Sequence, residues 1–232
     1  MSAQIIRAKD RFHHRTDWLS TYWHFSFDHY YDPGNVGFGP LRVFNDDTVQ
    51  PGTGFPPHSH ADMEIVSWVL SGTLEHRDSQ GHRGTIGAGE VQVMSAGTGI
   101  THAEHNPSAS EPVHFLQIWI RPRRRGATPR WAQQRFSPAE RAGRLFPIVA
   151  GDDRAPLAID QDATLAVAAL AAGQTVTHAT APDRRAYLFV IDGSLLVNGD
   201  LLATGDQARI SGVAQLELAS TAPSELILID LP

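Results

Sequence analysis

Residues 52–64 read Gly52-Thr-Gly-Phe-Pro-Pro-His58-Ser-His60-Ala-Asp-Met-Glu64, and the apolar run Ile65-Val-Ser-Trp-Val-Leu70 follows directly. The two histidines separated by one residue are the feature that decides how this stretch folds. In a β-strand, residues i and i+2 point to the same face and lie about 6–7 Å apart along the backbone. His58 and His60 therefore predict a strand that presents two imidazoles on one side, where both can reach one metal ion.

A second pair, His102-Ala-Glu104, repeats this spacing with a carboxylate as its second group. If the two strands are neighbours in a barrel, the four side chains converge on its interior. Three imidazoles and one carboxylate suit Fe(II), Ni(II), Mn(II), Co(II), Cu(II) or Zn(II), and the pattern does not choose among these ions. They leave coordination positions open, which is typical of a catalytic rather than a closed structural site. An isolated His-x-His also occurs without metal, so the combination carries the prediction.

Short stretches of β-branched and aromatic residues dominate the chain, and most are bounded by Gly, Pro, Asn or Asp. They predict strands at 23–27, 41–44, 65–70, 91–94, 115–120, 165–170, 187–191, 194–197 and 225–230. Turn-forming pairs such as Asp192-Gly193 and Asn198-Gly199 lie between them. Many short strands at this spacing favour an all-β fold of antiparallel sandwiches or barrels.

The two halves of the chain look like copies of one β-barrel unit. Gly52 to Gly72 and Gly173 to Gly193 each span 20 residues, run through an apolar strand and end at a turn glycine. A repeated segment of this kind predicts a duplicated structural unit.

The segment between the halves has a different character. Ser137-Pro138-Ala-Glu140 has the pattern of a helix start, with Ser137 as N-cap and Glu140 closing a capping box. We therefore expect an N-terminal domain at 1–125, a linker with a short helix at 126–150 and a C-terminal domain at 151–232.

Composition limits the class of protein. The 232 residues contain no cysteine, which excludes disulfides, thiolate ligands and a cysteine nucleophile. The formal net charge of -6 argues against nucleic-acid binding by bulk charge, and a solvated linker face accounts better for the arginines within 121–125 than DNA contact does. No segment has the length and apolar character of a signal peptide or a membrane span, so we expect a cytoplasmic location without membrane contact.

Residues 52–64 resemble the first motif of the cupin superfamily, and residues 89–106 resemble the second. More narrowly, the chain resembles the pirin family over essentially its whole length, most specifically at 38–120. The segments that carry this resemblance are Phe55-Pro-Pro-His-Ser-His60, Met63-Glu-Ile-Val66, Leu74-Glu-His-Arg-Asp78, Met94-Ser-Ala-Gly-Thr-Gly-Ile-Thr-His-Ala-Glu104 and Glu111-Pro-Val-His-Phe-Leu-Gln-Ile-Trp119. The chain length is similar to that of compact bacterial members often called quercetin 2,3-dioxygenases.

The resemblance implies a bicupin, that is, two antiparallel β-barrel or jelly-roll domains, with one divalent metal in the N-terminal barrel. The ligands it implies are His58, His60, His102 and Glu104. The ion we expect is Fe(II), with Ni, Mn, Co, Cu or Zn as alternatives. Glu64, whose counterpart is a ligand in many cupins, would instead orient an imidazole or serve the strand.

The C-terminal half departs from the motif. With Gly173 aligned on Gly52, and Gly205 aligned on Gly89, other residues occupy the ligand positions. These positions fall on Ala179, Ala181, Leu218 and Ser220, while the position of Glu64 falls on Arg185. His178 lies one residue off. We therefore expect a degenerate second barrel without metal.

The implied activity is that of an oxidoreductase that opens a flavonol such as quercetin with dioxygen and releases carbon monoxide. Metal binding would acidify the 3-hydroxyl of this small aromatic substrate, and Glu104 would take its proton as a general base. Two alternatives stay open: a different enolic substrate, or a non-enzymatic, metal-dependent regulator with a protein partner. The remaining histidines are expected to be structural, with hydrogen bonding at His105 and His114 and surface or loop positions at His76 and His82.

Overall fold

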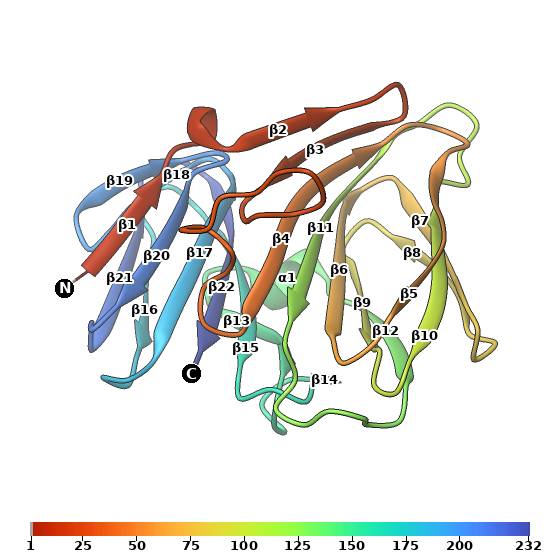
Figure 1. Cartoon of the computed structure of the whole chain (residues 1–232). Coiled ribbons are helices and arrows are strands. Elements are labelled where there is room, and N and C mark those ends of the chain that lie inside the picture. Colours follow the sequence, from red (N-terminus) through yellow and green to blue (C-terminus); the bar gives the residue numbers. More distant parts are fainter. Residues whose placement is uncertain (1) are drawn as a thin grey trace. The chain divides into compact units, whose positions relative to one another are not determined.

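The structure is a computed structural model that describes residues 2–232 (Figure 1). It consists almost entirely of antiparallel strands, arranged in two compact units. The N-terminal unit comprises residues 12–136 and 157–161, and the C-terminal unit comprises residues 2–11, 137–156 and 162–232. Within residues 2–232, no helix qualifies as a membrane span.

Two facing sheets form the N-terminal unit. The larger sheet has the strand order β12-β9-β6-β11-β4-β3-β2, and the smaller has the order β5-β10-β7-β8. The bounds in the larger sheet are β2 Phe12–Arg15, β3 Leu19–Trp23, β4 Leu41–Val49, β6 Glu64–Ser71, β9 Glu90–Ser95, β11 Val113–Ile120 and β12 Arg130–Arg135. Those in the smaller sheet are β5 Gly54–His60, β7 Thr73–Asp78, β8 Arg83–Gly87 and β10 Ile100–His105; the two-residue strand β14, Leu157–Ala158, also belongs to this unit.

An apolar core lies between these two sheets. Val69 and Phe115 project from the larger sheet and pack with Leu74 and Ile86 from the smaller one, and all four are completely buried. Alternation of inward and outward side chains explains the pattern, because every second residue of a strand faces the partner sheet.

The C-terminal unit has the same design. Its sheets have the orders β1-β20-β17-β22-β15-β13 and β16-β21-β18-β19. The strands of the first are β1 Ser2–Ile6, β13 Phe146–Ala150, β15 Thr164–Leu170, β17 Arg185–Asp192, β20 Gln207–Ser211 and β22 Ser224–Leu231. Those of the second are β16 Thr175–Ala179, β18 Ser194–Val197, β19 Asp200–Ala203 and β21 Gln215–Ser220; a 3₁₀ turn, η1 Ala8–Asp10, follows β1, and α1 is Pro138–Arg141.

The predicted repeat is confirmed strand by strand. The order β9-β6-β11-β4 in one unit corresponds to β20-β17-β22-β15 in the other, and β5-β10-β7-β8 corresponds to β16-β21-β18-β19. The repeated glycines have a common reason: Gly72 and Gly193 have φ values of 77° and 86°, in the left-handed region that favours glycine. A Cβ at either position would also lie within 2.5 Å of a carbonyl oxygen, so each turn needs glycine for space as well.

The capped helix start is confirmed, but the observed units divide the chain differently from the expected domains. Ser137 caps the one-turn α1, and Glu140 closes the capping box. The first strand, β1, pairs with β20 of the C-terminal unit, and residues 130–135 of the expected linker form β12, which pairs with β9. Backbone pairing between distant segments, rather than chain order, sets these boundaries.

Most predicted strands are found with shifts of a few residues at their ends. The stretch 23–27 is an exception, because its strand begins at Leu19 and ends at Trp23. Phe27 instead makes an isolated bridge to Tyr30 around Asp28, whose φ of 46° is incompatible with an extended strand.

Candidate metal centre

Three histidines converge where β5 and β10 pair within the smaller sheet of the N-terminal unit. His58 lies directly opposite His102 in this antiparallel pair, and His60 follows on the same face of β5. The ring centroids lie 4.4 Å apart for His58 and His102, 4.8 Å for His58 and His60, and 5.0 Å for His60 and His102. Each ring can offer one nitrogen such that the three nitrogens lie within 4.8 Å of one another, the spacing of a shared metal ligand set.

The hydrogen bonds of these rings leave one face of each histidine available. His58 Nδ1 lies 2.8 Å from the carbonyl oxygen of Pro56, so Nδ1–H donates there and Nε2 keeps its lone pair. The Nε2 atoms of His60 and His102 are buried and have no hydrogen-bond partner among residues 2–232. Buried polar atoms rarely stay unpaired, because each costs about 1–3 kcal/mol. These two nitrogens, together with the free Nε2 of His58, fit a divalent metal ion.

Electrostatics keep two of these imidazoles in the form that binds metal. Burial, followed by the neighbouring histidines His102 and His58, lowers the pKa of His60 to about 3. Burial is also the main reason that the pKa of His102 falls to about 3. Both rings are therefore neutral at physiological pH, and a neutral imidazole offers the lone pair that coordination requires.

Glu104 is held in place two residues beyond His102. Its Oε1 accepts hydrogen bonds from Gln92 Nε2 at 2.6 Å and from Ser67 Oγ at 3.2 Å, and its Oε2 accepts one from Gln117 Nε2 at 2.7 Å. Burial raises the pKa of this carboxyl group. Glu104 also forms a second group of metal-ligating atoms at the same spacing, with His102 and His76.

The donors to Glu104 come from one row of residues that crosses the larger sheet. Gln92 on β9, Ser67 on β6, Gln117 on β11 and Asn45 on β4 are consecutive partners in the strand register. All four are buried. The first three hold Glu104, whereas the Oδ1 of Asn45 has no hydrogen-bond partner among the described residues. The polar row thus continues past Glu104 to a buried, unpaired acceptor on β4.

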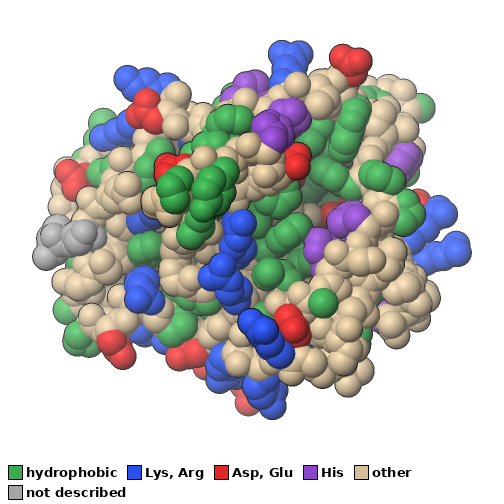
Figure 2. Space-filling model, viewed as in Figure 1, with side chains coloured by type: hydrophobic (Ala, Val, Ile, Leu, Met, Phe, Trp, Pro, Cys, Tyr) green, Lys and Arg blue, Asp and Glu red, His purple; other side chains and the backbone are tan. Residues whose placement is uncertain are grey.

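A pocket of about 620 Å³ opens beside these residues. Figure 2 shows a hollow on this face where histidine side chains lie among hydrophobic ones. Aromatic residues make up much of its wall, and its polar members include Asn45, Asp47, Glu104 and Gln117. The aromatic residues that line it are Trp18, Trp23, Phe27, Phe55 and Trp119, and His58 lies beside them. The volume lies in the range of small-molecule sites, and an apolar wall with few polar groups is typical of them.

Asp47 is another carboxyl group of this pocket, in addition to Glu104 and Asp28. It is buried, and burial is the main reason that its pKa rises to about 7. A sizeable fraction of Asp47 is therefore protonated near neutral pH and able to donate a hydrogen bond.

Comparison with known proteins assigns the chain to a family. The profile of the family described as Pirin matches residues 5–120, and that described as Quercetinase C-terminal cupin domain matches residues 148–231. This chain belongs to the pirin family. Both halves of the bicupin are thereby accounted for, in agreement with the fold.

Full-length relatives support this assignment. A protein named Quercetin 2,3-dioxygenase from Escherichia coli K12 is 41% identical over 228 residues, which cover 98% of both chains. A Pirin-like protein from Caulobacter vibrioides is 44% identical over 215 residues, covering 92% of each chain. The crystal structure of bacterial pirin YhhW from Escherichia coli in complex with nickel(II) superposes with a TM-score of 0.94 at 39% identity, covering 100% of this chain and 99% of that one. Family and histidine geometry together support a single divalent metal in this pirin.

The remaining predicted residues of this pirin are distributed around the site. Glu64 is buried on β6 and accepts a hydrogen bond from Ser95 Oγ on β9 at 2.5 Å. It therefore links two neighbouring strands of the larger sheet. His105 is exposed at the end of β10, and its predicted hydrogen-bonding role stays a prediction. His114 is hydrogen-bonded through Nε2 to Asp46 at 2.6 Å, a structural role.

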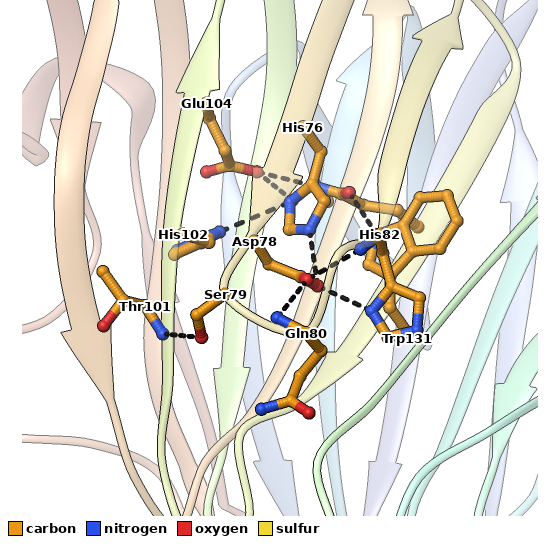
Figure 3. Close-up of polar contacts among 11 residues, drawn as sticks. His76, Asp78, Ser79, Gln80, His82, Thr101, His102, Glu104 and Trp131 are labelled. Atoms are coloured by element: carbon orange, nitrogen blue, oxygen red, sulfur yellow. Dashed lines mark hydrogen bonds and ion pairs between the residues drawn. The ribbon is translucent and has the colours of Figure 1, made fainter.

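The prediction for His76 was wrong. Instead of a surface or loop position, this ring is completely buried on β7, with its Nδ1 3.4 Å from Nδ1 of His102 (Figure 3). Strand β7 pairs with β10, which places His76 opposite Glu104 and Asp78 opposite His102. The signal in the sequence was the i, i+2 spacing of His76 and Asp78, the same spacing that identified the ligands.

The C-terminal unit shows which residues take the place of the ligands. The turn glycines Gly52 and Gly173 donate to the carbonyl groups of Asn106 and Ser220, which fixes how β10 and β21 correspond. Leu216 and Leu218 therefore take the places of His102 and Glu104, and His178 on β16, opposite Leu216, takes the place of His58. Leu216 and Leu218 are buried in the apolar core of that unit. His178 Nε2 is hydrogen-bonded to a carboxylate on β22 at 2.7 Å.

The predicted register of β16 was therefore wrong. Aligning Gly173 on Gly52 placed the equivalent of His58 at Ala179, one residue after His178, because β5 has a bulge opposite β10 that β16 lacks. Aligning Gly205 on Gly89 placed the equivalents of His102 and Glu104 at Leu218 and Ser220, two residues after Leu216 and Leu218.

Proposed function

We propose that this pirin is a metal-dependent dioxygenase that opens the ring of a flavonol of the quercetin type with O₂. The observation that carries the proposal is the convergence of three imidazoles at the wall of an aromatic-lined pocket. A closed structural metal site needs no such pocket, whereas a catalytic site does. The full-length relative named Quercetin 2,3-dioxygenase supports the choice of reaction.

Three histidines and one carboxylate would hold the ion. His58, His60 and His102 offer their Nε2 atoms, and Glu104 is the fourth donor that we propose. When bound, the metal supplies Lewis acidity that lowers the pKa of a substrate hydroxyl. We propose Fe(II) as the resident ion, while the nickel(II) complex of YhhW makes Ni(II) the first alternative.

The aromatic wall would orient a planar substrate. Trp23, Phe27 and Trp119 line the pocket on the side of the larger sheet, and Phe55 lines it from β5. Trp119 stacks edge-on against His60, with ring centroids 4.7 Å apart, which brings this wall next to the histidine group. Flat aromatic surfaces bind a flat ring system well and exclude water from it.

Glu104 would act as the general base. Burial raises its pKa, so the carboxylate takes a proton more readily than a solvent-exposed one. Gln92, Ser67 and Gln117 hold both oxygens from behind, so that the group keeps its orientation whether or not it carries the proton. Proton transfer from the flavonol 3-hydroxyl to Glu104 would leave an electron-rich enolate for reaction with O₂.

The far end of the polar row would recognise the rest of the substrate. Asn45 offers an unpaired acceptor and Asp47 a carboxyl group that donates when protonated. Together they suit a ligand with hydroxyl and carbonyl groups on an aromatic frame. Flavonols carry both kinds of group, and so do other enolic aromatic compounds. We expect the reaction to take place in the cytoplasm, in keeping with a chain that has no cysteine.

The test is dioxygen uptake on addition of quercetin. The protein is prepared free of metal and reconstituted separately with Fe(II), Ni(II), Mn(II), Co(II), Cu(II) and Zn(II). His102→Ala removes a metal donor, and His105→Ala serves as the matched control, because His105 is exposed on the same strand. We expect uptake that depends on the ion, is lost in His102→Ala and is kept in His105→Ala.

Each failure has its own meaning. No uptake with any ion, despite one bound metal per chain, would refute the flavonol dioxygenase and favour a different enolic substrate or a regulatory role. Uptake that survives in His102→Ala would refute the site.

A further inference from the structure

We propose that His76 and Asp78 are positioning residues of the metal centre: they fix the proton of His102 on Nδ1 and so aim the lone pair of Nε2 at the metal. This inference rests on the metal site of the proposed function, but not on its substrate. It follows from four hydrogen-bonding groups in a row, which Figure 3 shows between β10, β7 and the turn that follows β7.

The first step concerns the two rings. Nδ1 of His102 and Nδ1 of His76 lie 3.4 Å apart, so one must donate and the other must accept. If His76 donated, His102 would have to carry its own proton on Nε2, the buried ring nitrogen that has no hydrogen-bond partner among the described residues. A protonated Nε2 cannot coordinate a metal. The metal site therefore requires His102 to donate and His76 to accept.

The second step shows that Asp78 enforces this direction. Nε2 of His76 lies 3.2 Å from Oδ2 of Asp78, and an ionised carboxylate only accepts hydrogen bonds. His76 thus carries its proton on Nε2, which leaves Nδ1 as the acceptor that His102 needs. Burial works against ionisation of Asp78, but hydrogen bonds from His82 and His76 and from backbone amides outweigh it and lower its pKa.

The third step concerns how Asp78 is itself fixed. Its Oδ1 accepts from the backbone N–H groups of Gln80 at 2.9 Å and His82 at 3.0 Å, and its Oδ2 also accepts from Nδ1 of His82 at 2.9 Å. The Asp78 side chain is fully buried, while the His82 side chain is 38% exposed. A buried carboxylate with every lone pair occupied cannot rotate. It also cannot reverse the direction of donation in the chain of hydrogen bonds from His102 through His76 to Asp78, here called the relay.

A tryptophan braces the same rings. Trp131 of β12 stacks on His76 with centroids 5.4 Å apart and on His82 at 5.9 Å. Its Nε1 donates to Gln92 Oε1 at 2.9 Å, and Gln92 is the residue that donates to Glu104. His102 and Glu104 are thus oriented from behind by one connected set of side chains. Partners of this kind commonly change metal affinity 10–100-fold when removed.

Asp78→Asn is the decisive variant because it reverses the relay without changing its shape. The two backbone N–H groups at Oδ1 demand an acceptor, so the amide oxygen of the new side chain takes that place. Its NH₂ group then points at Nε2 of His76, which forces the proton of His76 onto Nδ1, where it opposes the N–H of His102. The same exchange of tautomer explains the loss of activity when the aspartate of a Ser-His-Asp triad becomes asparagine.

The experiment measures affinity for Zn(II) and Ni(II) by competition with a chromogenic chelator. We expect Asp78→Asn to bind about 10–100-fold more weakly than the wild type. One control should leave affinity unchanged. Asp230→Asn removes a carboxylate that pairs with His178 in the C-terminal unit, without a proposed metal ligand nearby.

A second measurement stands independently of the variant's folding. Nitrogen-15 NMR of histidine side chains in the Zn(II)-loaded wild type shows which ring nitrogen carries each proton. We expect His102 to be protonated on Nδ1 and His76 on Nε2. A proton on Nδ1 of His76, or a folded Asp78→Asn with wild-type affinity, would overturn the relay alone. A wild-type protein that binds neither ion would overturn the metal site and the relay with it.

Discussion

The buried carboxyl group of Asp47 predicts an unusual dependence of stability on pH. Its pKa is about 7 in the folded protein, mainly because of burial, against 3.8 for an exposed aspartate. The folded state therefore holds this proton more tightly than the unfolded state. Below pH 3.8 both states are protonated and the contribution is fully present; it is lost as the pH rises through 7. The difference of roughly three pKa units corresponds to about 4 kcal/mol at 1.36 kcal/mol per unit.

Asp47→Asn removes this titration while keeping the size of the side chain. The free energy of unfolding is measured by urea denaturation of metal-free protein at a series of pH values from 5 to 8. Of the total of about 4 kcal/mol, about 2–3 kcal/mol should be lost by the wild type within this range. The free energy of unfolding of the variant should therefore rise relative to that of the wild type as the pH increases. Working from a difference cancels the contributions of titrating groups that do not interact with Asp47. The slope with pH is also independent of any constant cost of the amide.

Asp17→Asn provides the matched control, because Asp17 is an exposed carboxylate of the same unit. Its difference from the wild type should be small, since exposed charges contribute little to stability. If Asp47→Asn gave a difference that did not change with pH, Asp47 would not hold its proton near neutral pH. The proposed role of that carboxyl group as a hydrogen-bond donor to the substrate would then fall as well.

Three further outcomes follow from the structure. His102→Ala should abolish stoichiometric metal binding measured by atomic absorption, while His105→Ala, exposed on the same strand, should keep it. Gly54→Ala should weaken metal affinity in chelator competition and lower the free energy of unfolding by about 1–3 kcal/mol, because its Cβ would lie 2.2 Å from a carbonyl oxygen of β10. Gly87→Ala, where the atom nearest to the new Cβ is 3.5 Å away, should change neither quantity. Burial opposes ionisation of Asp230, but hydrogen bonds from a histidine and an arginine outweigh it and lower the pKa of this group. The stability that Asp230 contributes is therefore lost as the pH falls through its folded pKa. Asp230→Asn should make the loss of stability at acid pH less steep, as followed by circular dichroism.

The histidines of the metal centre were predictable because their signal is local. His58 and His60 are two residues apart in one strand, so the geometry of the strand alone brings them to one face. That β5 and β10 are neighbours does not follow from spacing, and the resemblance to a family supplied it. Whether Glu104 completes the ligand set stays a prediction, since in the structure its oxygens are held by Gln92, Ser67 and Gln117.

The residues behind the ligands were out of reach for a different reason. His76 approaches His102 only because β7 pairs with the far side of β10, and Asn45 joins the row that holds Glu104 only through the register of four strands. A shift of one residue in either register would turn these side chains to the opposite face. Strand β12 was missed because five of its six residues are exposed, which gives no alternation to recognise.

Comparison of equivalent positions in the two units shows what a metal site requires. Both have the same strand order, yet where the N-terminal unit has His102 and Glu104 the C-terminal unit has Leu216 and Leu218. Apolar side chains at these places extend the core and stabilise the unit without any ligand. In the N-terminal unit, His102 and His60 each leave a buried nitrogen unpaired among the described residues, at about 1–3 kcal/mol each, until an ion binds them. Metal binding and stability of the N-terminal unit are therefore linked, because the ion binds the folded site and has no comparable partner in the unfolded chain.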